Sequence, residues 1–322
     1  MRDLIPAPDA ADLPAALKAA AGKANDYAHA ATAANTKRAY RAAWASFTRW
    51  CGDKGLDPLP AHPATVGLYL ADHADALKVS TLRLRLAAIS QAHRTAGHRL
   101  DTADPAIRRV MSGIARTKGV AVAKKEAVTG EILRDALRAY AGGAAMKAKR
   151  DRALLTVGFF AALRRAEIAA IDAADLAFTR EGVVLTLRRR KTDQEGQGTE
   201  IGLPAKDDAT ICPVVALRAW LAASGICEGA IFRSISKGDR LLAPRLGDKD
   251  VARIVKAAAA AAGYDAAAFG GHSLRSGFIT TCARKGVPER VIANQSGHKS
   301  VNVLRGYVRR AGVFNENAAA MI

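Results

Sequence analysis

One short charged segment separates two long stretches of helical periodicity, and this break constrains the fold more than any other feature. The segment, RTKGVAVAKKEA at 116–127, contains glycine and shows little apolar periodicity, as linkers between domains do. On either side of it, apolar residues recur at the spacing of amphipathic helices. A chain of 322 residues is long for one compact core and sufficient for two. We therefore expect two mainly helical domains, at 31–118 and 128–310, joined by a linker at 119–127.

The N-terminal domain is expected to contain four to five helices after a mobile arm. Residues 1–30 are rich in Ala, Asp and Pro and show little periodicity, so we assign them to the arm. The helices are predicted at 36–50, 64–76, 80–97 and 104–116. The first has an aromatic stripe that belongs in a core, formed by Tyr40, Trp44, Phe47 and Trp50. Ser80 can cap the third helix, on whose surface we place Arg83, Arg85, His93 and Arg94.

The C-terminal domain combines helices with one β-hairpin. Its β signal is VVLTLR at 183–188, followed by a Gly-rich turn and a second short strand at 199–204. A helix begins near Thr129, and others are predicted at 149–162, 213–223, 248–262, 273–285 and 288–296. The expected fold class is thus mainly α, with a small antiparallel sheet in a mixed α+β C-terminal domain.

The strongly basic charge points to a polyanionic partner. The chain carries 49 Lys and Arg against 30 Asp and Glu, a net charge of +19. Residues 1–127 contribute +8 and the remainder +11, so both halves are basic and suited to two surfaces that meet one nucleic acid. The candidate DNA-contacting residues are Lys37, Arg38, Arg41, Arg83 and Arg85. The first three of them lie on the side of the first helix opposite the aromatic stripe. A solvated basic face that only aids solubility is the alternative for all of them.

The sequence gives little sign of a membrane or a metal site. It has no run of about 20 apolar residues, and its first residues lack the apolar core of a signal peptide. Its four cysteines are scattered without a Cys-x-x-Cys pair, which argues against a zinc site or a disulfide framework and fits a reducing cytoplasm. We therefore expect a cytoplasmic, nucleoid-associated protein without a metal or cofactor.

Four short segments hold the polar residues that phosphoryl transfer without a metal requires. They are ALRRAEIAAI (162–171), RRRKTDQEG (188–196), GGHSLRSGF (270–278) and SGHKSVNVLRGYVRR (296–310). Cations must surround the phosphorus, and a nucleophile and an acid for the leaving oxygen must be present. Arginines bind phosphate with two parallel hydrogen bonds, and a phenol can act as the nucleophile. The candidates are Arg164, Lys191, His272, Arg275, His298 and Tyr307.

Each of these residues also has an ordinary explanation. Arg164 stands beside Arg165, so either can be a surface charge, and Lys191 can belong to a solvated basic edge. The two histidines taken singly are more often structural, and Tyr307 alone is more often a core tyrosine. The joint pattern is therefore what carries the prediction.

That joint pattern resembles the tyrosine recombinase (integrase) family, whose catalytic set runs Arg, Lys, His-x-x-Arg, His or Trp, Tyr. Here the order is Arg164, Lys191, His272-x-x-Arg275, His298, Tyr307, and the spacings after Arg275 suit the family. ALRRAEI is similar to the family's Gly-Leu-Arg-x-x-Glu-Leu block, with Ala162 in place of its glycine, a change that matters only if the position needs a positive φ. The likeness implies that Glu167 orients a catalytic His or Lys. It extends upstream to the helical (SAM-like) core-binding domain of Cre-like integrases and covers about 32–310.

The resemblance implies site-specific cleavage and rejoining of double-stranded DNA through a 3′-phosphotyrosyl link and a Holliday junction. It also implies recombination sites with inverted repeats, a homotetramer on DNA, and independence from ATP and metal. After Tyr307 comes a tail at 311–322, in which Ala318, Met321 and Ile322 form an apolar face that can pack into a neighbouring protomer; a frayed terminus is the alternative. A type IB topoisomerase and a non-catalytic DNA-binding protein with the same fold are the rival functions.

Overall fold

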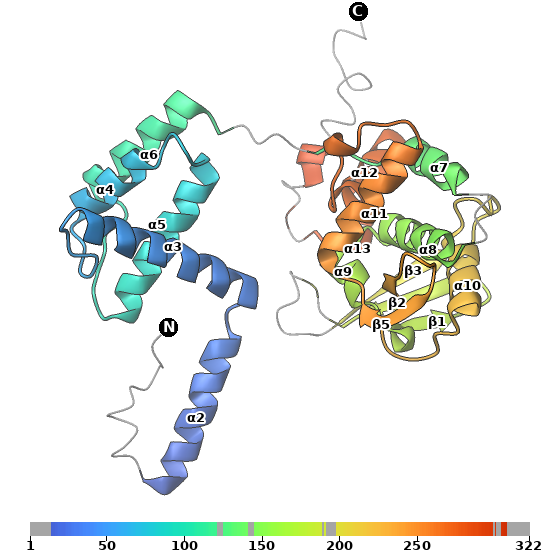
Figure 1. Cartoon of the computed structure of the whole chain (residues 1–322), viewed down its shortest axis with the longest axis horizontal. Coiled ribbons are helices and arrows are strands. Elements are labelled where there is room, and N and C mark those ends of the chain that lie inside the picture. Colours follow the sequence, from blue (N-terminus) through green and yellow to red (C-terminus); the bar gives the residue numbers. More distant parts are fainter. Residues whose placement is uncertain are drawn as a thin grey trace, which may run out of the picture. The chain divides into compact units, whose positions relative to one another are not determined.

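The structure is a computed structural model that describes residues 14–120, 125–140, 145–188, 190, 198–298, 300 and 304–307. Contacts within the chain divide it into two compact units, Met1–Ala123 and Lys124–Ile322 (Figure 1). The described residues contain no helix long and apolar enough to cross a membrane.

Unit 1 is helical. Its helices are α2 (Ala15–Ala30), α3 (Ala34–Asp53), α4 (Pro63–Asp72), α5 (Val79–Thr95) and α6 (Pro105–Lys118). Helix α3 packs on α5 and α4 packs on α6, around a core that includes Phe47, Tyr69, Leu70 and Ile89. Three residues of the aromatic stripe face the core as predicted: Phe47 is fully buried, and Trp44 and Trp50 pack beside it. The fourth, Tyr40, is half-buried and lines a pocket.

Three features of unit 1 differ from the expectations. Helix α2 occupies half of the segment assigned to a mobile arm, because its many alanines have the highest helix propensity. Ser80 does not cap α5: the helix begins one residue earlier, at Val79, with Lys78 before it. His93 is fully buried and not on the surface, and its Nε2 accepts a hydrogen bond of 2.8 Å from the Ala61 backbone N–H. A buried backbone donor needs a partner, and this histidine provides it.

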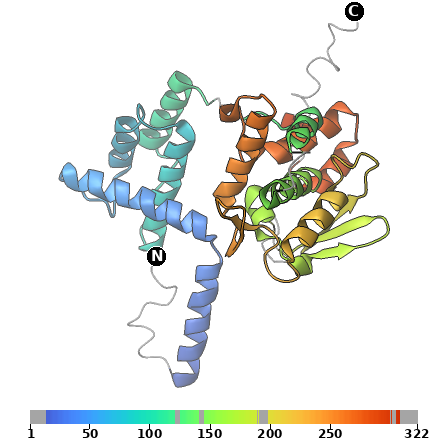
Figure 2. The same cartoon turned by 45° about the vertical axis from the view of Figure 1, so that its right-hand side comes forward.

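Unit 2 is built around one buried helix. Helix α8 (Met146–Phe160) packs against the other long helices of this unit (Figure 2). They are α7 (Gly130–Ala139), α10 (Pro213–Ser224), α11 (Asp248–Ala261) and α12 (Ser273–Arg284), and α8 also contacts the short helix α9 (Arg165–Ala170). Helix α13 (Glu289–Ser296) packs on α12. Most of the second half of α8 is apolar and buried, which fits its central position.

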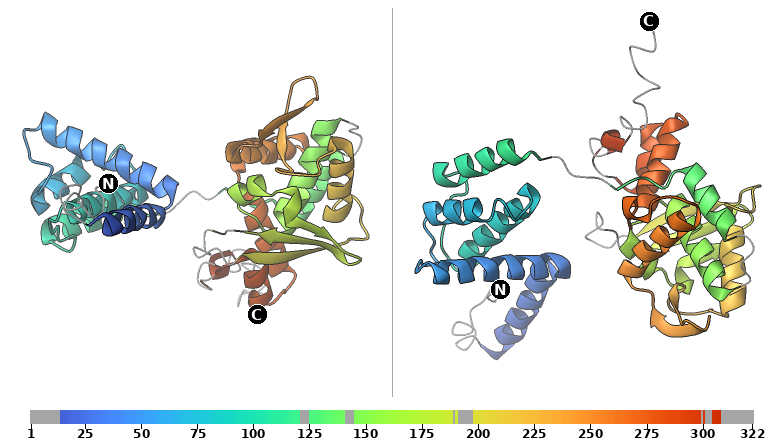
Figure 3. Two further views of the ribbon diagram at one scale, coloured as in Figure 1. Left: turned by 90° about the horizontal axis from the view of Figure 1, so that it is seen from below. Right: turned by 45° about the horizontal axis from the view of Figure 1, so that its top comes forward.

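The β structure lies at the edge of unit 2 (Figure 3). Strands β1 (Leu176–Phe178), β2 (Gly182–Leu187) and β3 (Thr199–Pro204) form an antiparallel sheet in that order, and β2 and β3 are the predicted hairpin. Strands β4 (Arg233–Ile235) and β5 (Leu241–Arg245) form a second, two-stranded sheet that the sequence did not reveal. The predicted fold class, mainly helical with a small antiparallel sheet, is confirmed.

The chain enters unit 2 along the start of α12. The backbone N–H of Val128 donates to the Ser273 carbonyl (2.9 Å), and that of Glu126 donates to the Ala268 carbonyl (2.8 Å). This backbone approaches α12 so closely that a Cβ at Gly277 would overlap the Val128 carbonyl oxygen. Residues 125–127, which we assigned to the linker, therefore pack on unit 2.

Candidate active site

Arg164 is positioned by the turn between α8 and α9. Ala162 has a φ of +50°, so the turn does need the left-handed conformation that glycine adopts without strain. Two residues later, the Arg164 backbone N–H donates to Glu167 Oε2 (2.8 Å), and its Nη1 donates to Glu167 Oε1 (2.6 Å). The buried carboxylate of Glu167 thus holds Arg164. The resemblance implied a His or Lys partner for Glu167, and the candidate lysine, Lys191, lies outside the described residues.

Arg275 lies in the first turns of α12 and is 1% exposed. Its Nη1 donates to the backbone carbonyls of Ala162 (2.7 Å) and Ser296 (2.5 Å), and its Nη2 is 3.2 Å from a ring nitrogen of His298. The turn at Ala162 is therefore coupled to both arginines: it precedes Arg164 and provides a carbonyl for Arg275. Burial lowers the pKa of Arg275 to about 10, and repulsion by Arg164 adds to the effect.

His298 follows the C-terminal end of α13, where Gly297 adopts a φ of +65°. Its Nδ1 lies 2.7 Å from the Ser296 hydroxyl, which holds the ring next to Arg275. Burial, followed by the charge of Arg275, lowers the pKa of His298 to about 4. The imidazole is consequently neutral near pH 7, so it has one donor and one acceptor nitrogen.

His272 and Tyr307 belong to the same cluster. His272 precedes α12, and its pKa is lowered first by burial and then by the charge of Arg275. The Tyr307 ring is partly buried against a small core of Ile279, Ile292 and Leu304, and its centroid is 6.2 Å from that of His298. Five of the six predicted residues are thus brought together from segments up to 143 positions apart in the sequence.

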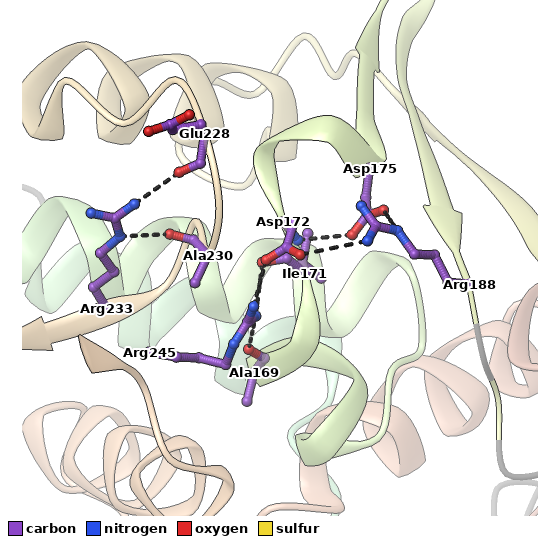
Figure 4. Close-up of polar contacts among 9 residues, drawn as sticks. All are labelled: Ala169, Ile171, Asp172, Asp175, Arg188, Glu228, Ala230, Arg233 and Arg245. Atoms are coloured by element: carbon purple, nitrogen blue, oxygen red, sulfur yellow. Dashed lines mark hydrogen bonds and ion pairs between the residues drawn. The ribbon is translucent and has the colours of Figure 1, made fainter. Parts of the chain in front are cut away.

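Lys191 and the tail residues Ala318, Met321 and Ile322 lie outside the described residues. The beginning of the segment that carries Lys191 is held by ion pairs (Figure 4). Arg188, the residue after β2, pairs with Asp175 (2.6 Å) and Asp172 (3.7 Å), and Asp172 also pairs with Arg245 of β5 (2.6 Å). These contacts join the end of β2 to β5.

Arg190 is a residue that the sequence reading missed. It is 5% exposed, and its Nη2 donates to the Ser296 carbonyl at 3.4 Å, the same oxygen that Arg275 contacts. In the sequence it is one of four consecutive basic residues, and no local signal shows which of the four is buried.

The predicted DNA-contacting residues of unit 1 differ in their surroundings. Arg38, Arg41 and Arg83 are exposed, and Arg83 lines a pocket together with Tyr40 and Arg94. The remaining two residues are less exposed. Lys37 is half-buried. Arg85 is half-buried as well, and its Nη1 donates to the Tyr69 hydroxyl (2.6 Å). Its guanidinium therefore makes a hydrogen bond within unit 1.

Sequence comparisons relate the chain to DNA-rearranging enzymes. Residues 131–312 match the Phage integrase family. A curated relative, the integrase/recombinase XerD homolog of Selenomonas ruminantium, is 38% identical over 287 residues, which cover 88% of this chain and 84% of the relative.

Solved structures of similar fold come from the same class of enzymes. A Tn1549 transposon integrase in complex with transposon right end DNA has a TM-score of 0.60 and 14% identity, with 89% of this chain and 95% of that chain covered. The XerH site-specific recombinase bound to a palindromic difH substrate has a TM-score of 0.59 and 17% identity, with coverages of 80% and 71%. At these identities the similarity concerns the fold.

Proposed function

The chain belongs to the phage integrase family and is a site-specific recombinase, and we propose that it cuts and rejoins double-stranded DNA through a covalent bond between Tyr307 and a 3′ phosphate. The observation that carries this proposal is the convergence of Arg164, His272, Arg275 and His298 on the region of Tyr307.

The cluster suits attack on a phosphodiester. Arg164 and Arg275 neutralise the non-bridging oxygens, and their geometry is set in advance by Glu167 and by two backbone carbonyls. His272 and His298, both kept neutral, donate hydrogen bonds to the phosphate or accept the phenol proton. Lys191 protonates the leaving oxygen.

The proposed cleavage step exchanges one phosphate ester for another. The Tyr307 oxygen forms a bond to phosphorus as the bond from phosphorus to the 5′ oxygen breaks. The 5′ oxygen takes a proton and leaves as a hydroxyl. Rejoining is the reverse reaction with a 5′ hydroxyl from a partner duplex, which makes and later resolves a Holliday junction. Because the phosphotyrosine conserves the ester bond, the reaction has no need of ATP, metal or cofactor.

The assembly follows from the need for two duplexes. We propose that four protomers hold two recombination sites with inverted repeats. Lys37, Arg38, Arg41, Arg83 and Arg85 are proposed to contact the DNA backbone. The tail with Ala318, Met321 and Ile322 is proposed to pack into a neighbouring protomer.

The test is Tyr307→Phe on a nicked DNA substrate. After cleavage of this substrate, the short piece that carries the 5′ hydroxyl dissociates, so that rejoining cannot occur. The wild type is expected to accumulate an adduct that survives denaturant, and the variant none, because only the nucleophilic oxygen is missing. DNA binding, measured by anisotropy, should stay within about 3-fold, because phosphate contacts spread over the whole surface dominate affinity. Adduct formation by the phenylalanine variant would show that the nucleophile is another residue.

A further inference from the structure

Arg190 stands out because it is a buried cation with few partners. It is 5% exposed, and among the described residues its buried Nε has no hydrogen-bond partner and its Nη2 reaches only the Ser296 carbonyl, at 3.4 Å. Removing a charge from water costs folding free energy that partners normally restore. Arg150 shows the usual arrangement at the same exposure: its Nε and Nη2 donate to Asp151 at 2.8 and 2.6 Å.

Arg190 lies within the cluster described above. Arg190 Nη2 and Arg275 Nη1 donate to one carbonyl, that of Ser296, so the two nitrogens are separated by no more than the sum of the two distances, 5.9 Å. The guanidinium also packs on the turn that carries His298, since a Cβ at Gly297 would overlap Arg190 Nη1. Burial lowers the pKa of Arg190, while the carboxylate of Glu167 raises it.

The charges of the described cluster do not balance. Arg164, Arg190 and Arg275 provide three positive charges, and Glu167 is the one carboxylate among their main electrostatic neighbours in the described part of the chain. Two positive charges are left over. A phosphodiester carries one negative charge, and the pentacoordinate state formed on attack approaches two. Surplus positive charge among the described residues stabilises the more negative transition state more than the substrate, which is the condition for catalysis.

We propose that Arg190 is a third arginine of the active site, whose buried charge stabilises the phosphate in the transition state without having to touch it. This inference rests on the function proposed above and adds a residue to it. The described part of the fold holds this charge in place before DNA binds with few partners of its own, so that no reorganisation is needed during the reaction.

The test compares Arg190→Met with Arg150→Met in the full chain. Arg190→Met removes an under-compensated charge and keeps an apolar side chain, so we expect an unchanged or higher Tm. Its cleavage rate should nevertheless fall about 100-fold below that of the wild type, as expected for the loss of one preorganised charge. Its DNA affinity should stay within about 3-fold of the wild-type value. Arg150→Met leaves Asp151 with one partner fewer, so a lower Tm and, below that temperature, an unchanged cleavage rate are expected.

A second substrate separates an electrostatic role from a structural one. A methylphosphonate at the cleavage position removes one negative charge from both the substrate and the transition state. The loss caused by Arg190→Met should then shrink to less than about 10-fold, because less charge remains to be stabilised. An equal loss on both substrates, a lower Tm that accompanies the lost activity, or a rate within about 3-fold of wild type would each overturn the proposal. If the wild type forms no adduct with the ordinary phosphodiester substrate, the proposed function is refuted instead.

Discussion

Ala162 occupies a backbone conformation that side chains with a Cβ rarely adopt, and it sits between the two arginines of the site. Its φ is +50° and its carbonyl accepts from Arg275. We expect Ala162→Gly to change the free energy of unfolding by less than about 1 kcal/mol, because relief of strain offsets the lost methyl group and the greater freedom of the unfolded chain. Ala162→Val should cost more than about 2 kcal/mol, since a β-branched residue is least tolerated there.

Urea unfolding of both variants, together with the cleavage rate, checks this prediction. The valine variant should also cleave more slowly, because the Arg275 acceptor moves. Equal stability of the valine variant and the wild type would show that the turn is not strained.

The histidine at 298 predicts a specific dependence of stability on pH. Its pKa is about 4 in the folded protein, against an ordinary value of 6.5, so between these values the unfolded chain binds a proton that the folded chain does not. Stability should therefore fall as the pH is lowered from about 6.5 to about 4, and this loss should stop below that window. In His298→Gln the slope of unfolding free energy against pH should be smaller. An identical slope would contradict the lowered pKa.

At the scale of elements, residue 128 packs closely against α12, the helix that carries Arg275 and follows His272. A Cβ at Gly277 would overlap the Val128 carbonyl oxygen, and backbone atoms there cannot move independently of α12. Gly277→Ala is expected to lower the free energy of unfolding by about 1–3 kcal/mol. Gly113→Ala in α6 is the matched control: nothing lies within 4 Å of its Cβ, so it should stabilise by about 0.5–1 kcal/mol. Denaturant unfolding measures both.

Charge is a property of the whole molecule, and it predicts how DNA affinity depends on salt. The net charge is +19, divided between both halves of the chain. If Arg38 and Arg41 each contact a phosphate, replacing both with Ala should reduce the slope of log affinity against log salt by about 2. The cleavage rate at saturating DNA should not change. Arg253→Ala, which removes a charge already paired with Asp250, should leave the slope as it is. Equal effects of the two changes would rule out specific contacts by α3.

The sequence alone determined the helix-rich fold, the β2–β3 hairpin and the order of the candidate residues from Arg164 to Tyr307. Helical and strand periodicity are local properties of the sequence. The order of the candidate residues in their four segments can likewise be recognised without coordinates. Only the tertiary structure decided which polar groups are buried and what they contact. In the folded protein Glu167 pairs with Arg164, and His93 is buried and accepts a hydrogen bond from the Ala61 N–H. Arg190, one of four consecutive basic residues, is buried and reaches the Ser296 carbonyl. The reason is physical: burial and partner choice depend on segments far apart in the chain, and no local spacing encodes them.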